Sequence, residues 1–156
     1  WSYFRKFSYL KKDYAISMPG VIYKNTGDID DFTIVNQVMK EDTRHSAVLV
    51  EGDKLLIFFS RKGDRPERIL LTTIDLTLPS SLWKTTSPIE VLRPEREWEG
   101  AYLPLYKSVE SAINIPVNQL RDPAIYTEEG KNYLIYSIRG ENGIGIVEFS
   151  LENIQK

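Results

Sequence analysis

The stretch over residues 120–137 constrains the fold of this chain more than any other. A charged entry, Arg121-Asp122, leads into a short apolar strand at 124–126, a Glu-Glu-Gly turn and a second strand at 133–136. Pro123 fixes its own φ and favours an extended backbone at the residue before it. We therefore expect Asp122 to present its carboxylate at the start of a strand that supports it.

The middle of the chain repeats this unit. The strands predicted there cover, in order, 46–50, 54–60, 69–76 and 89–92, with a tight turn at Glu51-Gly52-Asp53. The last unit continues with a third strand over 144–151. The pairs Arg44-His45 and Arg121-Asp122 then hold equivalent entry positions.

A weaker copy covers residues 14–35, and residues 1–12 read as an edge strand or a connector. The units therefore lie at about 9–38, 44–92 and 120–151, within a single domain or fragment spanning 1–156. Repeated four-stranded antiparallel meanders are typical of an all-β protein built from β-propeller blades. An irregular β-sandwich is the alternative.

Two or three blades do not close a propeller, because roughly four to eight are needed. We expect either further blades upstream of Trp1 or two copies that associate to complete the ring. The sequence begins without a Met or a signal peptide, which suggests a processed product or part of a longer protein.

Composition excludes several classes of function. The net charge of −2 gives no electrostatic reason to expect nucleic acid or an anionic membrane, and no apolar run approaches the roughly 20 residues that span a bilayer. The chain has no Cys and a single His, so we expect no thiolate or zinc site. Aromatic residues make up 12% of the chain, and sugar-binding clefts use such flat surfaces.

In a propeller, the residues at the starts of the innermost strands converge near the central axis. We therefore expect Arg44 and His45 to face the same cavity as Arg121 and Asp122. Further candidates come from the loops and the long irregular crossing at 93–119, namely Glu67, Glu141 and Glu99. Paired carboxylates beside arginines suit glycoside hydrolysis, in which one acid protonates the leaving oxygen and a second activates water or attacks the sugar. Glycoside hydrolysis requires no cofactor, although a structural cation in the central channel of a propeller would not be surprising.

Arg121-Asp122-Pro123, with the strand, acidic-Gly turn and strand that follow, resembles the blade-opening motif of the five-bladed β-propeller glycoside hydrolases of families 43, 62 and 32. Trp98-Glu99-Gly100 is similar to the element on which family 43 carries its general acid. This resemblance implies that Asp122 orients the acid or stabilises the transition state, and that Glu99 is the acid.

The substrate would be an oligo- or polysaccharide whose hydroxyls bind a set of charged residues: Arg44, His45, Glu67, Arg121 and Glu141.

The chain also departs from those families. The aspartate that opens their first blade has no match, and the Glu99 element precedes the Arg-Asp-Pro blade instead of following it. A non-catalytic carbohydrate-binding or interaction propeller is therefore the alternative function. Each candidate also has a structural interpretation: Asp122 can cap backbone N–H groups, Glu99 can be a solvated loop residue, and His45 can bond a neighbouring blade.

Overall fold

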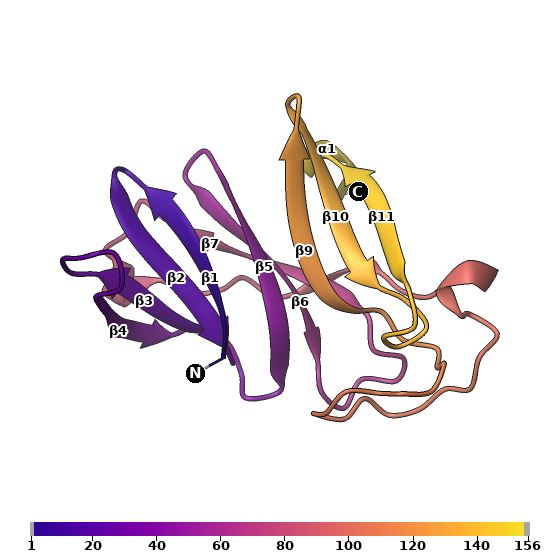
Figure 1. The fold of residues 1–156 in the computed structure, drawn as a ribbon. Coiled ribbons are helices and arrows are strands. Elements are labelled where there is room, and N and C mark those ends of the chain that lie inside the picture. Colours follow the sequence, from indigo (N-terminus) through magenta and orange to yellow (C-terminus); the bar gives the residue numbers. More distant parts are fainter. Residues whose placement is uncertain (1, 155–156) are drawn as a thin grey trace.

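The computed structural model describes residues 2–154 and consists of three antiparallel sheets with the strands of each sheet in sequence order (Figure 1). The first blade holds β1 (Ser2–Tyr9), β2 (Lys12–Met18), β3 (Val21–Asn25) and β4 (Phe32–Gln37). The second holds β5 (Thr43–Glu51), β6 (Lys54–Arg61), β7 (Ile69–Asp75) and β8 (Ile89–Leu92). The third holds β9 (Arg121–Glu128), β10 (Lys131–Ser137) and β11 (Ile144–Phe149). The helical turns are η1 (Ser80–Leu82), η2 (Glu97–Glu99) and α1 (Leu151–Ile154).

These sheets are consecutive blades of a β-propeller, which confirms the all-β propeller predicted from the sequence. The innermost strands β1, β5 and β9 lie next to one another, and the outer strands fan away from them (Figure 1). Residues 1–12 were predicted to be an edge strand or a connector. In the structure, β1 within this segment is a full strand of the first blade and pairs with β2.

The second blade is buried on both faces, which explains the continuous apolar run in β6. Leu55 and Ile57 point toward the first blade and pack with its Phe7 and Ile16. Leu56 and Phe58 point the other way, and the Phe58 ring lies edge-on to a third-blade phenylalanine, Phe149, with centroids 5.1 Å apart. A strand covered on both sides has no polar face, so its apolar residues do not alternate with polar ones.

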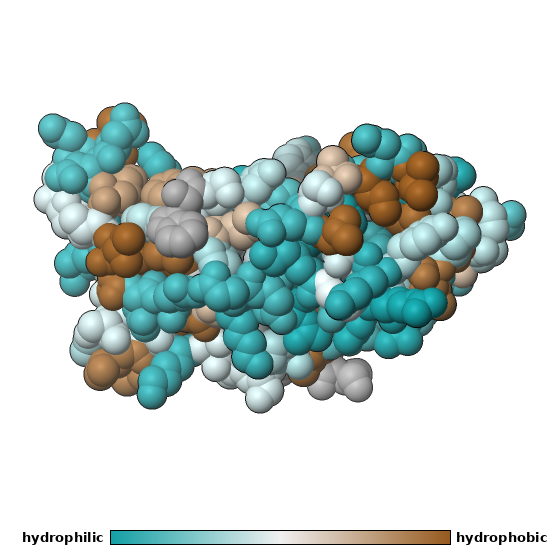
Figure 2. Space-filling model, turned by 90° about the horizontal axis from the view of Figure 1, so that it is seen from below, coloured by the Kyte–Doolittle hydropathy of each residue, from teal (hydrophilic) through white to brown (hydrophobic). Residues whose placement is uncertain are grey.

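The outward faces of the two end blades carry exposed apolar side chains. Ile34 of β4 is 62% exposed, and Ile144 and Ile146 of β11 are 77% and 59% exposed. Figure 2 views the end of the molecule where β1 and β9 begin, and it shows hydrophobic side chains gathered toward both ends with a hydrophilic band across the middle. The centre of this end, which we term the pole, is therefore polar, while the flanks are apolar.

The three innermost strands share one irregularity. Each ladder shifts register close to the start of the inner strand, between Ser2 and Arg5, between Thr43 and Ser46, and opposite Ile135 and Ser137 in the third blade. A bulge of this kind re-aims the side chains that it carries. The same device therefore operates at the pole of every blade.

The crossing between β8 and β9 is irregular, apart from η2, and it runs across the pole end of the second blade. Ser108 exchanges backbone hydrogen bonds with Gly63 and Asp64, both at 3.0 Å, and Leu120 N–H donates to the carbonyl of Glu67 at 3.0 Å. This segment therefore covers the loop between β6 and β7. No helix in the described part of the chain is long and apolar enough to cross a membrane.

Candidate functional site

Side chains from three consecutive blades meet at the pole. His45 of β5 contacts Asp122 of β9 through Nδ1 and Oδ1. The Tyr3 ring of β1 lies over the His45 ring with centroids 3.6 Å apart. Tyr3 is 46% exposed, and the side chains of His45 and Asp122 are 16% and 27% exposed, so all three can reach a ligand. The structure thus brings His45 and Asp122 to one place, as expected for entries that converge.

The bulges correct the alignment of the blades. Matching the register shifts makes Tyr3 and Arg44 the structural equivalents of Asp122. The sequence had matched Arg44-His45 to Arg121-Asp122, one residue out of step. This mismatch of one residue arises because β5 has 9 residues and β9 has 8. An alignment that matches the turns after the two strands is therefore shifted by one residue at their starts.

The backbone of Asp122 differs from the prediction. Its φ is +49°, in the left-handed region, whereas the proline that follows favoured an extended conformation. Asp is among the residues that tolerate positive φ best, yet such a position still costs on the order of 1–3 kcal/mol. Tyr3, at the equivalent place in β1, has φ +61°. Both residues therefore have a backbone conformation at the bulge that a regular strand would not give.

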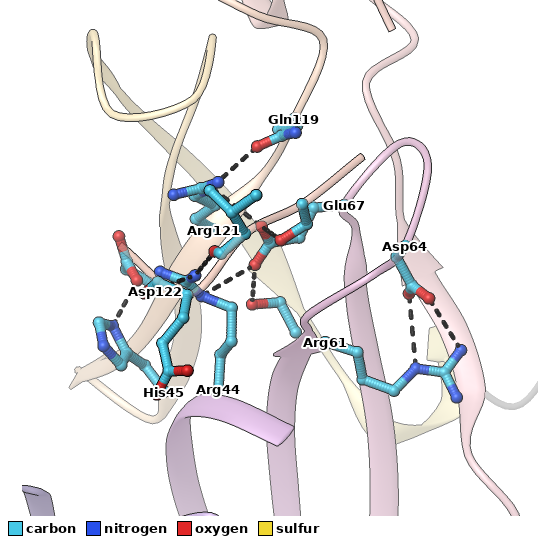
Figure 3. Close-up of polar contacts among 12 residues, drawn as sticks. Arg44, His45, Arg61, Asp64, Glu67, Gln119, Arg121 and Asp122 are labelled. Carbon is cyan, nitrogen blue, oxygen red and sulfur yellow. Dashed lines mark hydrogen bonds and ion pairs between the residues drawn. The ribbon is translucent and has the colours of Figure 1, made fainter. Parts of the chain in front are cut away.

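A buried carboxylate lies beneath this surface. Glu67, from the loop between β6 and β7, is fully buried. It forms ion pairs with Arg44 Nε at 3.2 Å and with Arg121 Nε at 2.9 Å (Figure 3). Ser60 Oγ donates to its Oε1 at 2.6 Å, and Ser108 Oγ donates to its Oε2. Glu67 therefore joins β5, β6, β9 and the crossing segment.

The two guanidinium groups have further partners within the protein. Arg44 donates to the carbonyls of Val109 and Glu110, the latter at 3.1 Å. Arg121 donates to Gln119 Oε1 at 3.0 Å, to Glu141 Oε1 at 2.8 Å and to the carbonyl of Ser111 at 3.3 Å.

These contacts change the interpretation of three residues expected to hold sugar hydroxyls. Glu67 and Arg121 are fully buried and Arg44 is 4% exposed, so none of them faces a ligand at the surface. Their polar atoms bind each other and the crossing segment instead. They support His45, Asp122 and Glu141 from below.

The electrostatics of the pole keep Asp122 ionised. Burial alone would raise the pKa of Asp122, but the interaction with His45 and the positive charges of Arg44 and Arg121 outweigh burial and lower it. Burial raises the pKa of Glu67, and its arginine and serine partners act in the opposite direction. A general acid at neutral pH needs a raised pKa, so Asp122 is suited to orient a group or act as a base.

Glu99 does not join this cluster. Its Oε2 accepts the backbone N–H groups of Glu95 at 3.0 Å and Arg96 at 2.9 Å, and its Oε1 accepts the hydroxyl of Tyr136 at 3.0 Å. Burial raises the pKa of Tyr136, and this hydrogen bond raises it further. Glu99 is 4% exposed and none of these contacts involves the pole. Its geometry is that of a buried cap on η2 and not that of a solvated loop residue, and its role as the acid stays a prediction.

Sequence reasoning missed Tyr3 and the buried supports Ser60, Ser108 and Gln119. Tyr3 sits in a stretch without clear periodicity, and only the shared bulge identifies it as an entry residue. The two serines belong to no recognisable sequence motif, because Ser60 lies 7 residues and Ser108 lies 41 residues from their partner Glu67 along the chain. Between residues 2 and 154, no group of three or more potential ligand side chains is placed to hold a metal ion.

No family model matches this chain. Over 102 residues, 65% of its length, it is 44% identical to an uncharacterized protein of Acanthamoeba polyphaga mimivirus, of which the match covers 29%. Its fold resembles that of an α-L-arabinofuranosidase from Lactobacillus brevis, with a TM-score of 0.60, 14% identity, and coverage of 94% of this chain and 49% of the other.

A Cellvibrio cellulosa α-L-arabinanase matches with a TM-score of 0.53, 13% identity, and coverage of 97% and 56%. At such low identity these structures establish a shared propeller fold and nothing about the site. The chain spans about half the length of the two solved proteins and less than a third of the viral one.

Replacing Glu67 with Gln tests the buried cluster. The change leaves two buried guanidinium groups without their shared counter-charge, so we expect the free energy of unfolding in urea to fall by about 3–5 kcal/mol. Glu110→Gln is the matched control, because Glu110 is 72% exposed and its pair with Lys62 is worth about 1 kcal/mol or less. Equal losses in the two variants would contradict the central role of Glu67.

Acid unfolding tests the state of Asp122. Because its pKa is lower in the folded protein than in the unfolded chain, where it is about 3.9, Asp122 stabilises the fold above that pH and loses this contribution as pH falls through the folded pKa. We expect stability to fall more steeply in the wild type than in Asp122→Asn between about pH 5 and pH 2. The exposed Asp30→Asn should follow the wild type. Parallel curves for the wild type and Asp122→Asn would show that the carboxylate is not held ionised.

Proposed function

We propose that the pole binds a neutral oligo- or polysaccharide through Tyr3, His45, Asp122 and Glu141. The observation that carries this proposal is the meeting of an exposed aromatic ring, an imidazole and an ionised carboxylate from three consecutive blades. An aromatic face packs against the apolar face of a sugar ring, while charged groups at its edge bind the hydroxyls.

The distribution of charge supports a neutral ligand. Arg44 and Arg121 are buried and already engaged by Glu67 and by carbonyl oxygens, so they offer no free positive charge at the surface. The groups that remain accessible are Tyr3, His45 and two carboxylates. A uronate, sulfate or phosphate group would meet these carboxylates and be repelled.

Glycoside hydrolysis is the second candidate. It is favoured by the ionised Asp122 at the opening of an Arg-Asp-Pro blade and by the two structural neighbours, which are an arabinofuranosidase and an arabinanase. Hydrolysis needs a second carboxyl group that acts as an acid. Glu99 is occupied as a cap and Glu141 is paired with Arg121, so we propose Asp122 as the orienting carboxylate or base of such a centre.

We further propose that the apolar outer faces of the first and third blades pack against additional blades, from a longer chain or a second copy. Exposed apolar areas of this kind mark interaction sites. Closure of the ring would bring more side chains to the pole, and the acid for hydrolysis would come from them.

Binding of neutral and acidic oligosaccharides, measured by calorimetry, tests this function. We expect arabinose-based oligosaccharides to bind and galacturonate oligomers not to bind. Tyr3→Ala should weaken binding at least about 10-fold, or ~1.4 kcal/mol, because the stacking face is lost. Tyr102→Ala, an exposed tyrosine on the crossing segment, should bind as the wild type does.

The same titrations separate the two candidates. Loss of turnover with retained binding in Asp122→Asn would establish hydrolysis, whereas binding without any turnover in the wild type would establish a recognition module. Tighter binding of galacturonate oligomers, or unchanged affinity in Tyr3→Ala, would overturn the proposal.

A further inference from the structure

A groove lies away from the pole, where the outer strands of the second and third blades approach each other. It encloses about 380 Å³, within the roughly 300–1,000 Å³ typical of small-molecule sites. The groove is lined by Glu90 of β8, Arg93, Trp98 of η2 and Val147 of β11. None of the pole residues lines this groove.

Trp98 is 48% exposed, whereas Trp83 is buried at 1%. Trp83 fills the core between the first two blades, where its indole N–H donates to the carbonyl of Leu78 at 2.9 Å. Trp98 has no such structural role among the described contacts. A large aromatic side chain left half in solvent beside a groove is characteristic of a binding surface.

The turn that carries Trp98 is held rigidly. Glu99 caps it through the backbone N–H groups of Glu95 and Arg96, and the hydroxyl of Tyr136 fixes that carboxylate from the third blade. Gly100 ends the turn with φ +92°, and a Cβ there would come within 2.8 Å of Leu103. Preorganisation of this kind lowers the entropic cost of binding. In this arrangement the role of Glu99 is to cap the turn and so hold the neighbouring Trp98 in place.

The charged groups that line the groove are three carboxylates, Glu90, Glu95 and Glu99, and two guanidinium groups, Arg93 and Arg96. Glu90 accepts hydrogen bonds from Arg93 through Nε and through Nη2, the latter at 2.6 Å, and pairs with Arg68 Nε at 2.8 Å. Paired carboxylate and guanidinium planes offer both acceptors and donors. This combination fits the hydroxyl groups of a neutral sugar better than an ion.

We propose that this groove is a second, non-catalytic binding site for a neutral sugar unit, with Trp98 as the stacking platform. The choice of ligand class rests on the proposed function, but the groove and its residues do not. Two separated sites on one propeller would hold a polysaccharide at two points along its length. Avidity from the second site would then strengthen binding to long chains far more than to short oligosaccharides.

Affinity gel electrophoresis in soluble arabinan tests the proposal with the full chain. We expect Trp98→Ala to lose most of the retardation shown by the wild type, while its affinity for a short arabino-oligosaccharide at the pole, measured by calorimetry, stays within about 2-fold. Trp98→Phe, which keeps an aromatic face, should recover part of the retardation, and Tyr102→Ala should match the wild type.

Quenching of tryptophan fluorescence by acrylamide measures the exposure of Trp98 directly. The Trp98 component is the fluorescence of the wild type minus that of Trp98→Phe. Arabinan should protect this component, in the wild type and also in Tyr3→Ala, so failure of the pole site and failure of the groove are distinguishable. Unchanged retardation in Trp98→Ala would overturn the proposal. Protection of Trp98 before any glycan is added would overturn it too, because it would show that another protein segment, such as a strand added beside β11, covers the groove.

Discussion

The buried carboxylate of Glu67 is the constraint on which the pole depends. Two guanidinium groups, one from the entry of β5 and one from the entry of β9, are removed from water and neutralised by a single side chain from a loop of the second blade. Taking such charges out of water is costly, and the arrangement persists only when the geometry is good and the other hydrogen bonds are made. Ser60 and Ser108 supply those bonds. The cluster therefore fixes the two blades and the crossing segment relative to one another.

The surface of the pole follows from this buried layer. His45 and Asp122 each adjoin in sequence an arginine that Glu67 holds, so their positions are set by the ion pairs beneath them. A bulge also lies near the start of each of the three inner strands, and the backbone of Asp122 has a positive φ. Backbone strain at a partly exposed carboxylate, supported by a rigid layer below, is the combination found at functional sites. The groove lined by Trp98 uses the same principle on a smaller scale, because the Glu99 cap holds the turn that carries Trp98.

The sequence predicted the architecture well because blades repeat. The turn at Glu51-Gly52 and the apolar strands on either side of it are local signals, and their recurrence identifies a propeller without any knowledge of contacts. Burial is not a local signal, so Arg44 and Arg121 looked like ligand-binding groups, although each is paired with a loop residue distant in sequence. A bulge also leaves no mark in composition, which is why Tyr3 and the true register of the entries became evident only from the structure.

A double-mutant cycle between His45 and Asp122 tests most directly whether consecutive blades are joined at the pole. The free energy of unfolding is measured for the wild type, His45→Ala, Asp122→Ala and the double variant. Contact between the two side chains predicts that their effects are non-additive by about 0.5–3 kcal/mol. Effects that add within about 0.3–0.5 kcal/mol would contradict a shared site.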